Sequence, residues 1–131
     1  MEDRWLVPLG GLAVTQCRVD HAFTLVVTDE PKQVFEVRIE QPFFIESRGV
    51  ESAIDLEAES ACLGPALSVL HQVVERASAF KDGRLGLAFA NGTLLRVPFS
   101  VEFEAWEIVG PDGLRIVSLP GGELALWRPS G

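Results

Sequence analysis

Hydrophobic and polar residues alternate with a period of two along much of the chain. Over residues 35–40, Phe, Val and Ile alternate with Glu and Arg, which predicts a strand with one face in solvent. Residues 23–28 alternate in the same way, and residues 29–32, which include a proline, predict a turn between the two stretches. We therefore predict an antiparallel hairpin, preceded by a strand over residues 14–19 and ended at Pro42, since proline cannot donate a ladder hydrogen bond.

The second half of the chain repeats this hairpin pattern. Asn91-Gly92 tolerates the positive φ angles of a type I′ turn and joins predicted strands over residues 85–89 and 93–99. Clusters of Gly and Pro separate three further predicted strands, over residues 103–109, 114–119 and 123–127.

The likeness of the two halves predicts an internal duplication within a single domain spanning residues 1–131. The duplicated units cover about residues 12–45 and about residues 72–109, and each contains a strand, a turn and a second strand. Two such units can pack sheet against sheet or extend one curved sheet, with a helix covering an open face or end.

The stretch between the two halves predicts a loop and a helix. Residues 46–59 carry five acidic side chains and one arginine, and Gly49 interrupts any regular element, so we expect a surface loop. Apolar residues spaced three and four apart predict a helix from Pro65 to about Val74, although Val74 equally suits the start of a strand. The predicted fold class is α+β: mainly antiparallel β, in two hairpin-rich halves, with one short helix between them.

Composition and charge narrow the class of protein. The chain has 131 residues, 47% of them hydrophobic, and 19 Asp and Glu against 11 Lys and Arg give a formal net charge of −8. These values suit a soluble globular domain, and the acidic balance argues against nucleic acid and anionic membranes as partners. The start of the chain lacks the regions of a secretory signal, and no apolar run is long enough to span a bilayer, so we expect a cytoplasmic protein.

Several short motifs resemble a known family. They are Glu104-Ala105-Trp106-Glu107, the run Pro-Gly-Gly-Glu-Leu-Ala-Leu-Trp over residues 120–127, Val14-Thr15, residues 18–20, residues 23–25 and residues 64–67. In these motifs the chain resembles a family of small actinobacterial proteins known as a domain of unknown function, over about residues 11–127. The resemblance implies one compact α+β domain and brings no activity, cofactor or catalytic residue.

The most enzyme-like pair in the sequence is Asp20-His21, because a carboxylate can orient an imidazole for general-base chemistry. Neighbours in a strand point to opposite faces, so we interpret His21 as a partly exposed residue at a strand end. Glu104 lies among carboxylates that suit a cross-strand charge ladder. A pocket formed by Asp20, His21, Glu104 and Trp106 is the alternative hypothesis, in which the protein is a small enzyme or a ligand carrier.

The cysteines and histidines carry no ligand pattern. Cys17 and Cys62 lack the spacing of a zinc knuckle or a thioredoxin-like motif, and we interpret both as small apolar residues. The sequence does not decide whether Cys17 and Cys62 form a disulfide. His71 lies on the predicted helix without a second histidine at ligand spacing. We therefore expect no catalytic residue, no metal and no cofactor.

Two surfaces suit a partner. One is an acidic partner face that consists of Glu51, Asp55, Glu57 and Glu59. The other is aromatic, because Trp106 and Trp127 suit either the core or an interface. The leading hypothesis is a non-catalytic binding or interaction module that contacts a protein partner, or a second copy in a homodimer, through a sheet edge or this aromatic surface.

Overall fold

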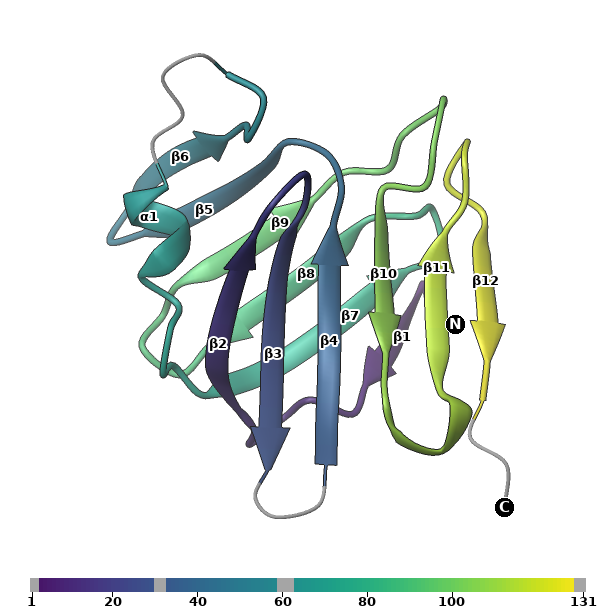
Figure 1. Cartoon of the computed structure of the whole chain (residues 1–131), viewed down its shortest axis with the longest axis horizontal. Helices are drawn as coiled ribbons and strands as arrows, with labels where there is room; N and C mark the ends of the chain where they lie inside the picture. Colours follow the sequence, from purple (N-terminus) through teal and green to yellow (C-terminus); the bar gives the residue numbers. More distant parts are fainter. Residues whose placement is uncertain (1–2, 30–32, 59–62, 129–131) are drawn as a thin grey trace.

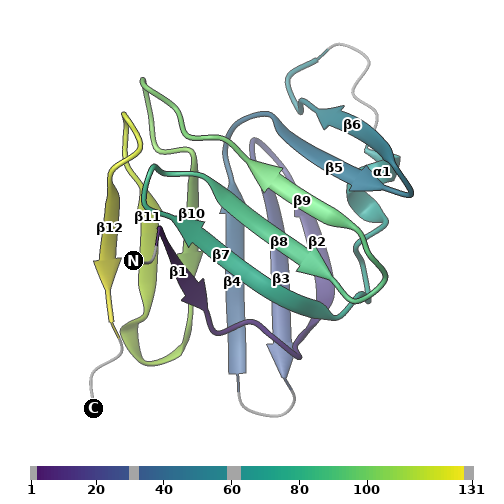
Figure 2. The same cartoon turned by 180° about the vertical axis from the view of Figure 1, so that it is seen from behind.

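Strands make up 54% and helices 6% of the computed structural model, which describes residues 3–29, 33–58 and 63–128. The strands form two antiparallel six-stranded sheets, sheet A and sheet B, that face each other as two layers (Figures 1 and 2). The predicted α+β class is therefore wrong: the fold is an all-β sandwich, and its one short α-helix adds no layer. Within the described ranges, no helix has the length and apolarity needed to cross a membrane.

The two sheets have six strands each. Sheet A runs in the order β1-β7-β8-β9-β5-β6, with β1 at Arg4–Val7, β5 at Phe43–Ser47, β6 at Val50–Ile54, β7 at Val74–Phe80, β8 at Leu85–Phe89 and β9 at Leu94–Val97. Sheet B runs in the order β12-β11-β10-β4-β3-β2, with β2 at Ala13–Val19, β3 at Phe23–Asp29, β4 at Gln33–Ile39, β10 at Trp106–Val109, β11 at Arg115–Ser118 and β12 at Leu124–Trp127. A short 3-10 helix, Pro111–Gly113, joins β10 to β11.

The predicted helix is wrong in its length. Helix α1 spans only Gly64–Leu67, and the Ser68 hydroxyl donates to the carbonyl of Pro65 at 2.6 Å. Beyond it the chain joins a sheet, because Val73 forms an antiparallel bridge with Ala13 and β7 begins at the next residue. Strand pairing therefore overrides the helical spacing of the apolar residues.

The predicted surface loop over residues 46–59 is wrong in its first half, which forms the β5–β6 hairpin. Its turn is Arg48-Gly49, with φ angles of 53° and 78°, the signs that a type I′ turn requires. Glu46 and Glu51 stand opposite each other across this hairpin, and the Arg96 guanidinium contacts both carboxylates. The arginine offsets the repulsion that a pair of like charges brings to a sheet.

The two halves of the chain take equivalent routes through the sheets. β2, β3 and β4 form a meander in sheet B before the chain crosses to β5, and β7, β8 and β9 form a meander in sheet A before it crosses to β10. Where the halves meet, the Val14 N–H donates to Gln72 at 2.9 Å and the Val74 N–H donates to Leu12 at 2.7 Å. The duplication stays a prediction. The pairing of β2, β3 and β4 nevertheless matches that of β7, β8 and β9, so each outward position on one meander has an equivalent position on the other.

Inward-facing side chains of both sheets form one hydrophobic core. Phe23 of sheet B and Phe43 of sheet A stack with their ring centroids 5.3 Å apart. Burying one large apolar side chain stabilises a fold by about 1.5–3 kcal/mol, so the core fixes the register of the central strands. The largest members of the core are Trp106, Phe23, Phe35, Phe43 and Phe89.

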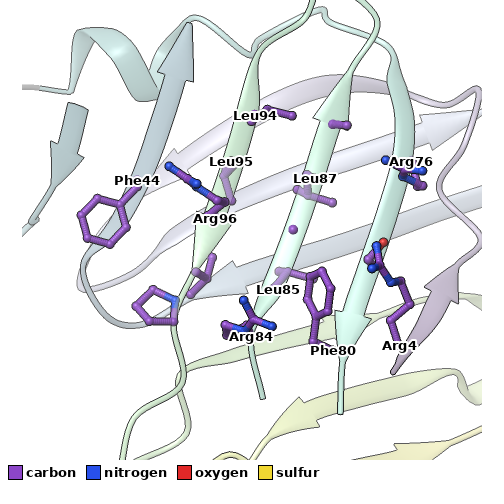
Figure 3. A pocket seen from close by; sticks show the side chains of 15 residues that line it. Arg4, Phe44, Arg76, Phe80, Arg84, Leu85, Leu87, Leu94, Leu95 and Arg96 are labelled. Carbon is purple, nitrogen blue, oxygen red and sulfur yellow. The ribbon is translucent and has the colours of Figure 1, made fainter. Parts of the chain in front are cut away.

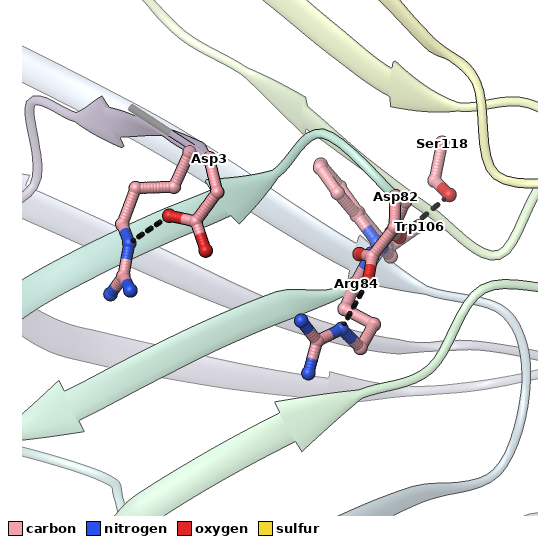
Figure 4. A network of polar contacts seen from close by, with 7 residues as sticks. Asp3, Asp82, Arg84, Trp106 and Ser118 are labelled. Atoms are coloured by element: carbon pink, nitrogen blue, oxygen red, sulfur yellow. Dashed lines mark hydrogen bonds and ion pairs between the residues drawn. The ribbon is translucent and has the colours of Figure 1, made fainter. Parts of the chain in front are cut away.

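Two hydrogen bonds tie the turn before β8 to sheet B. The indole N–H of Trp106 donates to the Gly83 carbonyl at 2.8 Å, and the Ser118 hydroxyl donates to the same oxygen at 2.9 Å (Figure 4). Gly83 has a φ of +100°, and a Cβ there would lie 2.8 Å from the Cβ of Phe99, so this position requires glycine. The tie holds the start of β8 against the core.

Candidate functional site

The outer face of sheet A is hollowed along β8. The groove has a volume of about 330 Å³, which lies within the range of small-molecule sites. Gly86 and Ala88 of β8 form its floor. Arg76 of β7 lies on one side of it, and Leu94 and Arg96 of β9 lie on the other (Figure 3). Phe44 of β5 and Arg4 of β1 lie at its two margins.

Cross-strand register explains why the groove follows β8. Two rows of outward-facing residues cross the sheet here, Ser78-Gly86-Arg96 and Arg76-Ala88-Leu94. In each row the residue from β8 has the smallest side chain, so the molecular surface over the middle strand is lower than the surface over the two neighbouring strands. A Cβ built on Gly86 would meet only the ring of Phe80, at 3.4 Å. The fold therefore does not require glycine at this position, unlike at Gly83.

The equivalent face of sheet B is closed by an ion pair. Arg18 of β2 and Glu36 of β4 meet at 3.2 Å across β3, and Val26 beneath them is only 6% exposed. By register, Ser78 and Leu94 of sheet A stand at the positions of Arg18 and Glu36. A serine and a leucine cannot form this bridge, so the middle strand of sheet A stays open.

One end of the groove carries two guanidinium groups. The guanidinium carbons of Arg4 and Arg84 each lie 4.6 Å from the ring centroid of Phe80. The Nε atoms of these arginines are also paired outside the groove, with Asp3 at 3.1 Å and with Asp82 at 2.8 Å (Figures 3 and 4). The hydrogen bond from Arg4 lowers the pKa of the Asp3 carboxyl. Among the described residues, the hydrogen bonds of both guanidinium groups run from Nε, so their terminal N–H groups can donate to a ligand.

The groove is positively lined in an acidic chain. Four of the 11 Lys and Arg residues line it, namely Arg4, Arg76, Arg84 and Arg96. The described residues that line it include no Asp or Glu, although the chain has a formal net charge of −8. An apolar floor with a guanidinium rim is therefore the distinguishing feature of this site.

A second, smaller pocket of about 180 Å³ contains one residue of the predicted enzyme-like pocket, His21, beside Phe103. Asp55 and Glu57, both from the predicted acidic face, line the same pocket. Asp20 and Glu104 do not line it. The structure thus brings His21 together with part of the acidic face rather than with Asp20 and Glu104.

The other three members of the predicted enzyme-like pocket, Asp20, Glu104 and Trp106, lie in separate places. Trp106 is fully buried in the core, and its indole N–H is engaged by Gly83. Asp20 is exposed, and its carboxylate accepts the Ala22 N–H at 2.8 Å, which lowers the pKa of Asp20. Glu104 is exposed in the segment before β10. These side chains do not converge on one site.

The predicted partner residues lie at several places. Trp127 on the edge strand β12 is 49% exposed, with the Arg115 guanidinium 5.0 Å from its ring. Glu51 contacts Arg96 at the margin of the groove, and Asp55 accepts the backbone N–H of Glu57 at 3.0 Å. The fourth residue of the acidic face, Glu59, lies outside the described residues.

Cys17 is half-buried against the core, and burial raises the pKa of its thiol. Cys62 lies outside the described residues, and so does any pairing between the two. In the part of the chain that the structure describes, no three His, Cys, Asp or Glu side chains come together in a way that could hold a metal ion.

The groove is the feature that sequence reasoning missed. One signal was present: in the alternation of β8 the outward positions are Gly86 and Ala88, where a solvent-facing strand usually has polar residues. The arginines around them come from four strands or their turns, β1, β7, β8 and β9, and only the sheet order brings them together.

The fold and the groove define a class, the small two-sheet β-sandwich domains with an open, ligand-sized groove on one outer face. A comparison with protein families matches residues 5–128, and the chain belongs to the Family of unknown function (DUF6188). The resemblance to a family of unknown function is thereby confirmed, whereas the actinobacterial source and the individual motifs stay predictions. No curated protein and no solved structure matches the chain.

Proposed function

We propose that this domain is a non-catalytic binding module and that its binding site is the groove over β8. The observation that carries the proposal is the open apolar floor of Gly86 and Ala88 between guanidinium groups. Arginine stays charged at neutral pH and only donates hydrogen bonds. The lining therefore offers apolar contact and charge, which suit reversible binding.

The expectations from sequence about partner and location belong to this proposal as well. The exposed Trp127 on an edge strand supports contact with a protein partner or a second copy of the chain. The net charge of −8 supports the exclusion of nucleic acid, and a cytoplasmic location stays a prediction. The alternative of a small enzyme or ligand carrier with a pocket around Asp20, His21 and Glu104 has less support, because its fourth member, Trp106, is fully buried.

A neutral fluorescent probe tests the groove without assuming the charge of its ligand. N-phenyl-naphthylamine brightens in apolar surroundings, and we expect the wild-type protein to bind it with amide NMR shifts at Gly86 and Ala88. Gly86→Val fills the floor, and valine suits a strand. The matched control is Ala53→Val, which adds methyl groups to the same outer face at an exposed position on β6, outside the groove.

A second variant closes the groove by another route. Ser78→Arg with Leu94→Glu places an ion pair over β8 at the register positions that Arg18 and Glu36 occupy over β3. Both the filled and the closed variant should lose probe binding, while Ala53→Val keeps it. Equal binding by all four proteins, or shifts confined to other surfaces, would show that the groove is not the site.

A further inference from the structure

We infer, on the basis of the proposed function, that the groove takes a small elongated amphiphile with a single carboxylate. Its apolar body lies along Gly86 and Ala88, and its carboxylate lies at the end marked by Phe80, where Arg4 and Arg84 flank the ring. Shape, position of charge and amount of charge each point to this class.

The shape of the groove is long and narrow. Its floor follows one strand from Arg84 to Ala88, a rise of about 13 Å at ordinary strand geometry. Its walls are the two neighbouring strands, each one strand spacing away. An extended chain or a narrow planar body fits this floor along its length, and a volume of about 330 Å³ suits a small molecule.

Two of the four arginines that line the groove lie at one end, whereas Arg96 is held by Glu46 and Glu51 and Arg76 lies in the row of Ala88. Arg4 and Arg84 both lie 4.6 Å from the ring centroid of Phe80, so two guanidinium groups share one aromatic ring. The floor beyond them consists of Gly86 and Ala88, which contribute no side-chain polar group. A ligand with its charge at the end that has two guanidinium groups, and with an apolar body over the floor, matches this order.

The amount of charge favours a monoanion. Asp3 and Asp82 already pair with the two arginines and offset part of their charge. The two carboxylates would repel a dianionic phosphate about twice as strongly as a monoanionic carboxylate, which can accept terminal N–H groups of Arg4 or Arg84. Planar guanidinium and planar carboxylate also match in geometry.

The face of sheet B supports a specific role for these residues. There the equivalent strand is covered by the Arg18–Glu36 ion pair, and the two faces share one pattern of strand pairing. An open groove is therefore not a consequence of the sandwich itself. It depends on Ser78, Gly86 and Leu94 at particular register positions.

Decanoate and decanol, equal in chain length and different in charge, test this inference. Each is used to displace N-phenyl-naphthylamine from the wild-type protein, decanoate below its micelle concentration and decanol below its solubility limit. We expect decanoate to bind about tenfold more tightly, as one or two charge-assisted hydrogen bonds imply, and this advantage to fall with added salt. Arg4→Gln with Arg84→Gln should remove most of the advantage and leave decanol binding unchanged.

The control variant is Arg115→Gln, which removes an exposed arginine from sheet B and should leave decanoate binding unchanged. Equal affinity for decanoate and decanol would overturn the carboxylate assignment while the proposed function stands. Tighter binding of decyl phosphate, or of an acidic peptide rich in aromatic residues, would assign another ligand class and likewise overturn it. Failure of the neutral probe itself to bind at Gly86 would instead overturn the proposed function.

Discussion

The carbonyl of Gly83 is a buried acceptor with two donors, and removing both donors should cost more than the sum of the single losses. Trp106 and Ser118 donate to it at 2.8 and 2.9 Å. Ser118→Ala leaves the carbonyl one donor, so we expect the free energy of unfolding to fall by about 1 kcal/mol. In the Trp106→Phe background the same substitution leaves a buried carbonyl unpaired, and the loss should be about 2–3 kcal/mol.

The four proteins of this cycle differ only at the two donors. Urea unfolding followed by far-UV circular dichroism gives each free energy, since tryptophan fluorescence itself changes on substitution of Trp106. The coupling between the two sites should be about 1–2 kcal/mol, well above the error of additivity for independent sites. Equal losses in both backgrounds would refute the reasoning, because they would mean that Gly83 finds another donor or tolerates having none.

Three further outcomes follow from the same contacts. Gly83→Ala should destabilise the fold by about 2–4 kcal/mol, because the new Cβ would lie 2.5 Å from the Cα of Gly122. Gly92 also has a positive φ, +91°, but has open space around it, so Gly92→Ala should cost about 1 kcal/mol. Urea unfolding of both variants checks this difference. Cys17, measured in a Cys62→Ser background, should react with iodoacetamide more slowly in the folded than in the urea-unfolded protein, and the folded rate should keep rising above the ordinary thiol pKa, since burial raises the pKa of Cys17. Asp20→Ala should lower the urea midpoint at neutral pH, because the hydrogen bond from the Ala22 N–H lowers the pKa of Asp20. The charged carboxylate therefore stabilises the fold at pH values above the unfolded-state pKa, and the difference between wild type and variant should vanish as pH falls through the folded-state pKa. A difference that persists in acid would contradict this prediction.

The strands were predictable where local pattern and tertiary burial agree. Residues 35–39 and 85–89 alternate in sequence, and the structure buries the apolar member of each pair in the core. The Asn91-Gly92 turn was predictable because few residues tolerate its backbone angles. β1 was not predicted, because both Leu6 and Val7 are apolar and show no alternation in the sequence. Only pairing with β7 makes Val7 buried and Leu6 exposed.

The helix and the acidic loop show where local pattern fails. The apolar spacing after Pro65 is compatible with a helix, but Val73 and Val74 gain strand partners from the distant residues 12–14. Glu46 and Glu51 suggest a solvated loop when read alone, because their repulsion is visible in the sequence and Arg96 is not near them. In both segments a contact remote in sequence decides the structure.

The candidate site was beyond local pattern for a related reason. Asp20 and His21 attracted interest as reactive types that are adjacent in sequence, yet Asp20 is engaged by the Ala22 N–H and His21 lies in a separate small pocket. The groove contains few side chains that a search for catalytic chemistry would select. The one signal for its floor was the placing of Gly86 and Ala88 at outward positions of β8, and the arginines around them meet only through the sheet order.

The groove and its closed counterpart follow from one difference in side chains over one pattern of strand pairing. Across β3, Arg18 and Glu36 reach each other and cover Val26. Across β8, Ser78 and Leu94 stand at the same register positions, and Gly86 and Ala88 are half-buried at the floor of the groove. A partly exposed ion pair adds little stability, so its loss over β8 has a small energetic cost. The fold can therefore hold an open groove on one face without weakening the core beneath it, because the inward sides of Leu85 and Leu87 stay fully buried whatever covers the outward side.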